Sequence, residues 1–226
     1  MTTTQDRRIT DLFGIELPII QAPMAGATTA EMVIAVSEAG GLGSLPGALL
    51  SVDQMRAALE RIRSATRKPV NLNFFVHSQP ADDADVQSKW TATLAPYYLE
   101  LGLDAAIPAS PAARAPFDDA YCGIVEDFRP EVVSFHFGLP EPRLMQRVRQ
   151  AGAKIMSSAT TVAEARWLEQ RGVDAIIAMG VEAGGHRGSF LTDDMTTQVG
   201  TMALVPQIVD EVRVPVIAAG GIADRR

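Results

Sequence analysis

The feature that most constrains this fold is a series of short apolar runs that are rich in β-branched residues and nearly continuous in hydrophobicity. Strands buried on both faces have this composition, and such strands belong to parallel sheets covered by helices. Strands with one face in water would instead alternate apolar and polar residues. The runs, which we predict to be seven strands, are Pro18–Met24, Gly41–Leu45, Val70–Phe75, Val132–Phe137, Lys154–Ser157, Ala175–Met179 and Val214–Ala219.

Helical patterns separate these runs. The segment Ser51–Gln54 has the spacing of a capping box and is followed by apolar residues at helical intervals. A second capping box lies at Thr161–Glu164, and Gly172 fits the left-handed end of that helix. Two further helices are predicted at Arg143–Ala151 and Ala203–Val212. Because strand and helix alternate, we expect right-handed βαβ units in one parallel sheet.

Two architectures accommodate this alternation: an open doubly wound sheet and a closed (β/α)8 barrel of the TIM type. A nucleotide-binding open sheet would carry Gly-x-Gly-x-x-Gly after its first strand, but Gln21–Gly26 lacks that spacing. Glycine pairs follow the sixth and seventh runs instead, and barrels often bind phosphate with their late loops. The sequence thus favours an α/β barrel, with residues 1–226 as a single domain that is incomplete after its seventh strand. An elaborated connection at about 77–119, partly helical around Lys89–Leu101, follows the third strand.

The composition of the chain limits the classes of partner that are expected to bind it. The formal net charge of −7 gives the chain no general attraction for nucleic acid or anionic membranes, so a small molecule is the expected partner. The single cysteine, Cys122, excludes an intramolecular disulfide and fits a reducing compartment. The N-terminus lacks the apolar core of a signal peptide, and no apolar run approaches the ~20 residues that span a bilayer. We therefore expect a cytoplasmic protein.

The most informative segment is Gly180–Gly188, which reads GVEAGGHRG and follows the sixth predicted strand. Barrel enzymes carry catalytic residues in the loops at this end of their strands. Gly184 and Gly185 allow close approach of a ligand, and His186 belongs to the residue type that exchanges protons near neutral pH. The alternative is a glycine-rich turn with a solvated histidine and arginine. The position after a barrel strand favours function.

Other polar residues have a structural explanation beside the functional one. Gly220 and Gly221 end the seventh strand, where backbone N–H groups either hold a phosphate or form a tight turn. Asn73 lies in an apolar strand, so its amide takes hydrogen-bond partners from a ligand or from neighbouring backbone. His136 also lies in an apolar strand, where a satisfied core histidine is the commoner case. His77 is a weaker candidate still.

Motifs that the sequence lacks narrow the chemistry. There is no His/Cys/Asp cluster with metal-ligand spacing, no Gly-x-Ser-x-Gly elbow and no Walker loop in the 226 residues. Cys122 is interpreted as structural. A single base, a buried amide and glycine-lined loops indicate redox chemistry on a bound cofactor rather than covalent hydrolysis.

Six segments carry a family resemblance: PIIQAPMAG, AGGLG, NLNFF, VSFHFGLP, EAGGHRG and AGGIAD, in that order. With them the chain resembles the nitronate monooxygenases, formerly called 2-nitropropane dioxygenases, which are FMN-dependent barrels. The resemblance runs from about Leu12 to Asp224, and the segment Glu182–Gly188 is its most specific part.

The resemblance implies an FMN site in which His186 is the catalytic residue facing the flavin. Asn73 would hydrogen-bond the isoalloxazine or the ribityl chain, and the glycines would lie along the phosphate and ribityl. Met179 stands where the family usually has Gln. Because Met cannot donate a hydrogen bond, the affinity for the flavin, or the way the protein tunes the flavin, would differ from that of the family. The implied flavin contacts are Ala22, Pro23, Met24, Asn73, Lys154, Met179, Gly184, Gly185, Gly220 and Gly221, with residues 157–160 beside Lys154.

The implied reaction is oxidation of an alkyl nitronate, or of a nitroalkane, with O2 as oxidant, giving a carbonyl compound and nitrite. His186 would act as general base on a neutral nitroalkane and would stabilise the charge of a nitronate. Two hypotheses remain beside this one: an FMN-barrel enoyl thioester or quinone reductase that uses NAD(P)H, and an inactive truncated fragment. A barrel without its eighth strand would expose unpaired strand edges, so weak FMN binding, marginal folding or a homo-oligomer that covers those edges is also expected.

Overall fold

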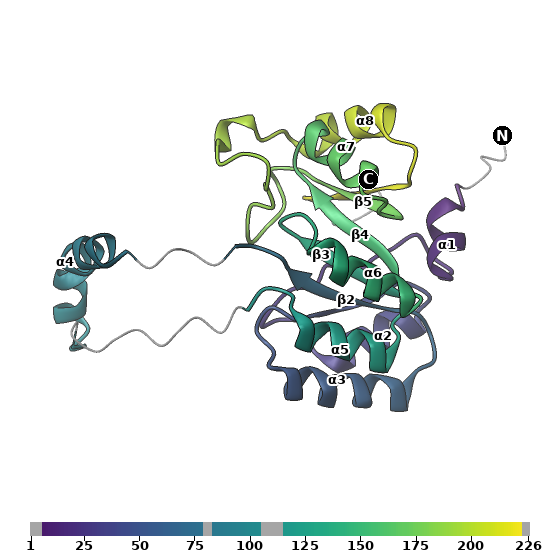
Figure 1. The fold of residues 1–226 in the computed structure, drawn as a ribbon, viewed down its shortest axis with the longest axis horizontal. Coiled ribbons are helices and arrows are strands. Elements are labelled where there is room, and N and C mark those ends of the chain that lie inside the picture. Colours follow the sequence, from purple (N-terminus) through teal and green to yellow (C-terminus); the bar gives the residue numbers. More distant parts are fainter. Residues whose placement is uncertain (1–5, 79–82, 105–114, 223–226) are drawn as a thin grey trace. The chain divides into compact units, whose positions relative to one another are not determined.

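The computed structural model describes residues 6–78, 83–104 and 115–222. In these residues six parallel strands form one curled sheet, and neighbouring strands follow one another in chain order (Figure 1). A doubly wound sheet would reverse its strand order at a switch point, and this sheet does not. The predicted α/β fold of the TIM-barrel type is confirmed. The strands are β1 Gly43–Pro46, β2 Val70–Phe75, β3 Val132–His136, β4 Lys154–Ala159, β5 Ala175–Met179 and β6 Val216–Ala219.

The first predicted strand, Pro18–Met24, is reduced to a single parallel bridge between Ile20 and Leu42. Pro18 and Pro23 lie on either side of this bridge and have no N–H to donate to a ladder. The prediction of a full strand was therefore wrong, although this segment does lie beside the residues that lead into β1.

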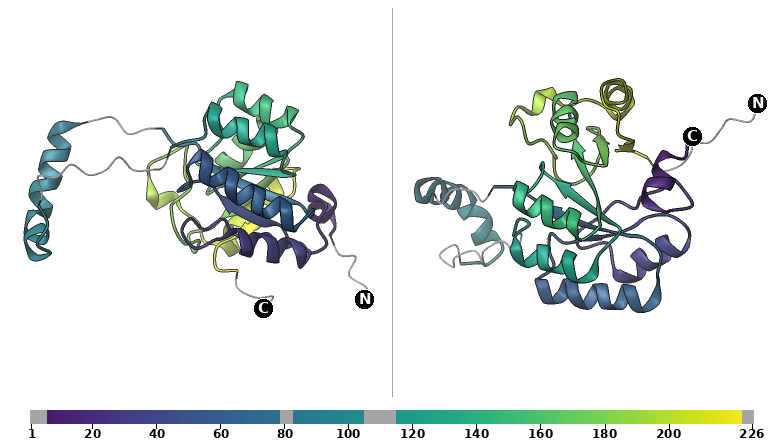
Figure 2. Two further views of the ribbon diagram at one scale, coloured as in Figure 1. Left: turned by 90° about the horizontal axis from the view of Figure 1, so that it is seen from below. Right: turned by 45° about the vertical axis from the view of Figure 1, so that its right-hand side comes forward.

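Helices cover the outer face of the sheet (Figures 1 and 2). The capping box before α3 forms as predicted, since Ser51 N–H donates to Gln54 Oε1 at 2.9 Å and Gln54 N–H donates to Ser51 Oγ at 3.2 Å. The helices of this part of the chain are α1 Arg8–Phe13, α2 Ala30–Glu38, α3 Val52–Ala65, α5 Asp119–Phe128, α6 Pro142–Gln150, α7 Val162–Gln170 and α8 Thr201–Glu211, with the 3-10 turn η1 Met195–Thr197.

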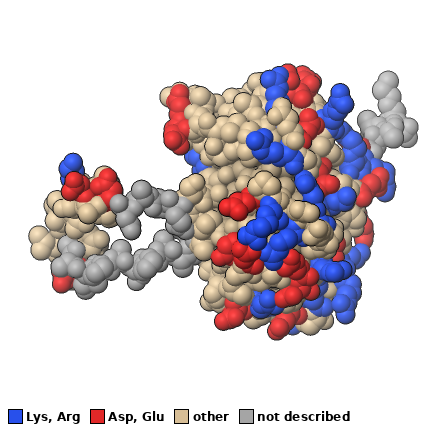
Figure 3. Space-filling view, viewed as in Figure 1, with Lys and Arg blue, Asp and Glu red and all other residues tan. Residues whose placement is uncertain are grey.

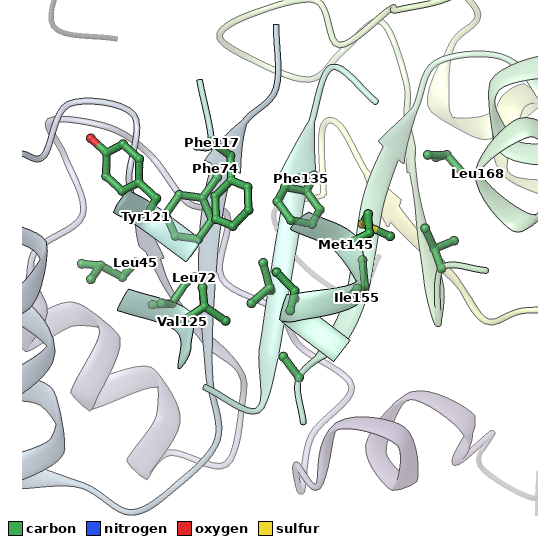
Figure 4. Packing of buried hydrophobic residues seen from close by; sticks show 14 of the residues in the cluster. Leu45, Leu72, Phe74, Phe117, Tyr121, Val125, Phe135, Met145, Ile155 and Leu168 are labelled. Carbon is green, nitrogen blue, oxygen red and sulfur yellow. The ribbon is translucent and has the colours of Figure 1, made fainter. Parts of the chain in front are cut away.

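The outer core lies between the helices and the sheet, and aromatic rings fill one side of it (Figure 4). The ring of Phe74 lies 4.8 Å from that of Phe117 and 5.6 Å from that of Tyr121, measured between centroids. Phe135, 1% exposed, continues the cluster at 5.2 Å from Phe117. This packing fixes β2 and β3, whose ends carry the candidate site.

A second, smaller core lies on the inner face where the strands begin. Phe13 and Ile15, at the end of α1, pack there with Val132, Met156 and Ala175. These apolar side chains close the amino-terminal end of the curled sheet, so the inner face is open to polar groups only nearer the strand ends.

The register of the strands determines where the polar side chains of the inner face lie. Side chains alternate between the two faces of a strand, so Leu72 and Phe74 enter the outer core while Asn71, Asn73 and Phe75 face inward. Asn73 is aligned with Ser134, and Phe75 with His136, on the neighbouring strand β3. The inner face therefore changes from apolar to polar and aromatic toward the carboxyl ends of the strands.

The connection after β2 forms a separate unit, Ser78–Ala113. Its helix α4, Ala84–Glu100, begins earlier than the predicted helical stretch around Lys89–Leu101. Asp83 caps it by accepting hydrogen bonds from the N–H groups of Asp85 and Val86. Among the described residues, no helix is both long and apolar enough to cross a bilayer.

Ion pairs join neighbouring helices on the outside of the larger unit. Arg143 of α6 lies 2.7 Å from the Asp119 carboxylate of α5, and Arg147 bridges Asp119 and Glu126 at 2.6 and 2.7 Å. Acidic and basic side chains are intermingled on the face shown in Figure 3. These pairs lie on the helices, away from the inner face of the sheet.

Candidate active site

The loop after β5 brings His186 to the carboxyl ends of the strands. The imidazole is exposed, and its edge meets the ring of Phe75, at the end of β2, with centroids 5.3 Å apart at 71°. It also meets the ring of Phe137, just after β3, at 5.9 Å and 88°. Residues from three strand ends therefore converge at His186, as expected for a barrel active site.

The three histidines of this chain gather around the same two rings. His77 lies 6.1 Å from Phe75 and 6.1 Å from Phe137, and His136 lies 5.5 and 4.3 Å from them. Phe137 has φ +72°, a left-handed conformation that costs a non-glycine residue about 1–3 kcal/mol. The neighbouring structure offsets that cost and keeps the Phe137 ring between the histidines.

His136 is held in place by Ser158 on the next strand, whose hydroxyl lies 2.7 Å from its Nδ1. Burial lowers the pKa of His136 from 6.5 to about 4; the nearby His186 acts in the same direction, and a backbone hydrogen bond with His186 opposes both. The imidazole of His136 is therefore uncharged at neutral pH. The sequence left open whether this histidine is a core residue, and the structure places it beside His186.

Two carboxylates tether the loop that carries His186. Glu182 accepts hydrogen bonds from the N–H and the hydroxyl of Thr201, both at 2.7 Å, at the start of α8. These bonds hold the pKa of Glu182 below its usual value. On the other side of His186, the fully buried Glu164 accepts hydrogen bonds from the N–H groups of Thr160 at 2.6 Å and Phe190 at 2.7 Å.

Sequence reasoning did not assign these anchoring roles. Glu182 was part of the most specific motif, and Glu164 was part of a predicted capping box. The side chain of Glu164 bonds to Thr160, four residues before it, and also to Phe190 in the loop beyond His186, and this second contact is one that no local spacing encodes.

Between its anchors the loop forms an open arch. A Cβ added to Gly184 or Gly185 would meet no atom within 4 Å, and Gly185 has φ +81°. Arg187 folds back onto the arch and donates to the carbonyl of Val181 at 2.7 Å and that of Ala183 at 3.2 Å. The arch therefore leaves room for a ligand against its backbone.

The turn after β6 adjoins the arch. Gly220 has φ +121°, and a Cβ there would lie 2.6 Å from the Thr201 hydroxyl and 2.9 Å from Ala183 N. The Thr201 hydroxyl lies 3.0 Å from Gly220 O. Gly221, with φ +71°, follows beside Glu182. The structure thus brings together the two glycine pairs that the sequence singled out.

Amides line the inner face below these loops. Asn73, 7% exposed, donates from Nδ2 to Ser134 Oγ at 3.0 Å. Asn71 was not singled out from the sequence; its Nδ2 donates to Ser44 Oγ and Ser134 Oγ at 3.0 and 2.9 Å. Its buried Oδ1 has no hydrogen-bond partner in the described part of the chain. The sequence Asn71-Leu72-Asn73 could have indicated this role, because residues two apart lie on the same face of a strand and Asn71 therefore faces the same way as Asn73.

The segment Ala22–Met24 follows the Ile20 bridge and lies near this inner face. Gln21, beside it, accepts a hydrogen bond from Ser44 N at 3.3 Å, and Ser44 in turn contacts Asn71. Met24 is 47% exposed. This segment is therefore open to a ligand at the side of the amides.

Met179 and Lys154 lie at opposite ends of the strands. Met179 ends β5, with its Sδ 3.2 Å from the position of a Cβ on Gly188. Lys154, which the resemblance implied as a flavin contact, is the first residue of β4, exposed, with Nζ 3.6 Å from Asp174. It therefore lies at the amino end of β4, opposite the end where the loops of the candidate site meet. The structure does not bring it together with His186.

Within the described ranges, no three His, Cys, Asp or Glu side chains are grouped as a metal site would require. Cys122 is free and buried in the outer core, where burial raises the pKa of its thiol. Its thiol is therefore a packing group, in line with the structural role expected for it.

Comparison with known proteins gives one consistent family. The chain is 42% identical over 228 residues to the nitronate monooxygenase of Paraburkholderia phytofirmans, covering 98% of this chain and 61% of that protein. It is 39% identical over 228 residues to the nitronate monooxygenase of Pseudomonas aeruginosa, covering 97% of this chain and 63% of that one. The chain thus spans about three fifths of the length of these curated relatives.

Two solved structures also superpose on most of this chain. A nitroalkane oxidase from Streptomyces ansochromogenes superposes with a TM-score of 0.79 at 35% identity, over 92% of this chain and 59% of that one. FabK from Thermotoga maritima superposes with a TM-score of 0.69 at 32% identity, over 96% of this chain and 55% of that one. The family profile described as nitronate monooxygenase matches residues 6–226. This chain belongs to the nitronate monooxygenase family.

Proposed function

We propose that this chain forms the flavin-binding barrel of an enzyme that oxidises alkyl nitronates, and nitroalkanes after loss of a proton, with O2. The products are a carbonyl compound and nitrite. The observation that carries the proposal is the position of His186: exposed on an open glycine arch, at the carboxyl ends of the strands, against the rings of Phe75 and Phe137. The names of the relatives support the same substrate class.

The residues of the site fit FMN. The buried Oδ1 of Asn71 lacks a partner in the described protein and can accept a hydrogen bond, and Asn73 offers a second amide beside it. Gly184 and Gly185 leave space along the backbone for a ribityl or phosphate group. We therefore assign the flavin to Ala22, Pro23, Met24, Asn71, Asn73, Met179, Gly184, Gly185, Gly220 and Gly221.

When bound, FMN would supply the redox chemistry, as the acceptor of the substrate's electrons and their donor to O2. The residues of this chain supply the proton transfer and the environment. His186 removes the α-proton of a neutral nitroalkane as general base, whereas for a nitronate its protonated form offsets the negative charge of the substrate. The rings of Phe75 and Phe137 flank the imidazole and exclude water from one side of it.

A reductase is the second candidate, because FabK from Thermotoga maritima superposes on 96% of this chain. An FMN barrel of that kind would take a hydride from NAD(P)H and deliver it to an enoyl thioester or a quinone. The lower TM-score of FabK, 0.69 against 0.79 for the nitroalkane oxidase, favours nitronate oxidation.

Steady-state assays separate the two functions. The FMN-loaded chain is supplied with propyl-1-nitronate in air, and O2 consumption and nitrite are measured; NADH with an enoyl thioester or a quinone is supplied in parallel. Nitronate oxidation predicts O2 uptake with nitrite release and no dependence on NADH. NADH oxidation driven by a thioester or quinone, without nitrite from the nitronate, would assign the reductase function instead.

A further inference from the structure

His136 is held on two sides by structure that belongs to the site. On one side its Nδ1 lies 2.7 Å from the hydroxyl of Ser158, which is only 3% exposed. On the other side lies the backbone of Gly188: a Cβ there would come within 2.6 Å of His136 Cε1 and 3.2 Å of its Nδ1. The imidazole is therefore packed between β4 and the loop after β5.

This packing acts on His186, because Gly188 is two residues beyond it. Gly188 is buried, whereas Gly184 and Gly185 on the other side of His186 have open space around them. The backbone of the loop is thus closely packed at Gly188, and the surface it meets there is the His136 ring, with Met179 Sδ beside it. Phe137 adds a second contact, since its ring lies 4.3 Å from His136 and 5.9 Å from His186.

We propose that His136 is a positioning residue for His186: fixed by the Ser158 hydroxyl, its imidazole forms the nearest part of the surface against which Gly188 packs, and it thereby sets where His186 meets the substrate. This inference rests on the proposed function, in which His186 exchanges the proton. His136 is not assigned any bond-making step.

The charge state of His136 suits this role. Burial keeps its pKa low, at about 4, and His186 is the charged or titratable neighbour that influences it. The other groups around its ring are the Ser158 hydroxyl and the Phe75 and Phe137 rings, which carry no charge. An uncharged His136 can lie against the loop without repelling a protonated His186, whereas a second imidazolium would oppose that proton.

The first test needs neither flavin nor turnover. The chain has three histidines, so selective 15N-histidine labelling gives three imidazole spectra that can be followed by NMR. His136 is expected to keep the signals of a neutral ring at about pH 5.5, where a free imidazole is mostly protonated. Ser158→Ala is expected to shift the imidazole signals of both His136 and His186.

The control is Ser37→Ala. The Ser37 hydroxyl is also buried and hydrogen-bonded, to Pro69 O at 3.0 Å and from Gly43 N at 3.2 Å, but it lies on α2 and touches no histidine. This variant should leave all three imidazole spectra unchanged. A protonated His136 at pH 5.5, or an unshifted His186 in Ser158→Ala, would overturn the proposal.

Kinetics on the FMN-loaded chain give the second test. Loss of one hydrogen bond that holds a positioning group should lower kcat for a neutral nitroalkane about 3- to 10-fold in Ser158→Ala, with KM little changed. His136→Asn, whose amide can occupy the place of Nδ1, should recover activity relative to His136→Ala. If the wild-type chain is active and Ser158→Ala has the same kcat, the positioning role is refuted but the proposed function is not. If the wild-type chain oxidises neither nitronate nor nitroalkane, the proposed function is refuted. The NMR experiment would then still test whether His136 and His186 are coupled.

Discussion

The carboxylate of Glu164, on α7, accepts a hydrogen bond from the backbone N–H of Phe190, four residues beyond His186, at 2.7 Å. The same side chain accepts from the N–H and hydroxyl of Thr160 at the end of β4. One buried carboxylate thus links a strand end, a helix start and the loop that carries the candidate base.

Glu164→Gln should destabilise the protein and loosen this loop. An amide replaces one acceptor oxygen with a donor that faces N–H groups, so at least one buried hydrogen bond to a charged group is lost, at a cost of about 1.5–3 kcal/mol. Urea unfolding measures the change. Glu60→Gln, at an exposed position on α3, is the control and should change stability by less than about 0.5 kcal/mol. Equal effects in the two variants would show that Glu164 is not an anchor.

Two glycines of the same loop should respond differently to an added methyl group. Gly188→Ala places a Cβ 2.6 Å from His136 Cε1, so the loop or the imidazole must move, at about 1–3 kcal/mol. Gly184→Ala meets no atom within 4 Å and has an ordinary φ, so the stability of the flavin-free chain should hardly change. Thermal unfolding of both variants without flavin distinguishes them. A lower Tm for Gly184→Ala than for Gly188→Ala would contradict the packing described.

Acid should weaken the fold through His136. Its pKa is lowered by burial from 6.5 to about 4 in the folded chain, so between these values the unfolded chain binds a proton that the folded chain does not. Stability is therefore lost as the pH falls through this window, by about 2 kcal/mol between pH 7 and 5 for this one group. His136→Asn removes that contribution, so its free energy of unfolding should fall less over the same range. Parallel pH dependences for the two proteins would rule the linkage out.

His186→Asn should separate the two substrates. Abstraction of the α-proton needs a base, and general bases contribute about 10²- to 10⁴-fold, so turnover of neutral nitroalkane should fall by at least 10²-fold. A preformed nitronate has already lost that proton and should be affected far less. Initial rates of nitrite release on each substrate provide the comparison. Equal losses would remove the assignment of His186 as base.

Local patterns predicted the elements well, and the site only in part. Six of the seven apolar runs match the strands β1 to β6 with each end within two residues, and the capping box at Ser51 formed as expected. The segment Pro18–Met24 failed as a strand because its prolines cannot extend a ladder. Lys154 begins its strand, as the apolar run indicated, so it was the flavin contact implied by the resemblance that the structure does not support.

The contacts that organise the site are non-local, which is why the sequence did not reveal them. Glu164 reaches Phe190 across 26 residues, and His136 reaches Ser158 across 22. Both pairs depend on the curvature of the sheet and on the path of a loop. The sequence did identify His186, Asn73 and the glycine pairs, because their residue types are unusual at the ends of, or within, buried strands.

We propose that the described strands and loops build a flavin site in which nitronate is oxidised. The direct measurement is the absorbance spectrum of the 226-residue chain with FMN, before and after anaerobic addition of propyl-1-nitronate. A bound-flavin spectrum that bleaches with nitronate and recovers in air is expected. FMN that binds and is not bleached by nitronate, or that does not bind this chain at all, would contradict it.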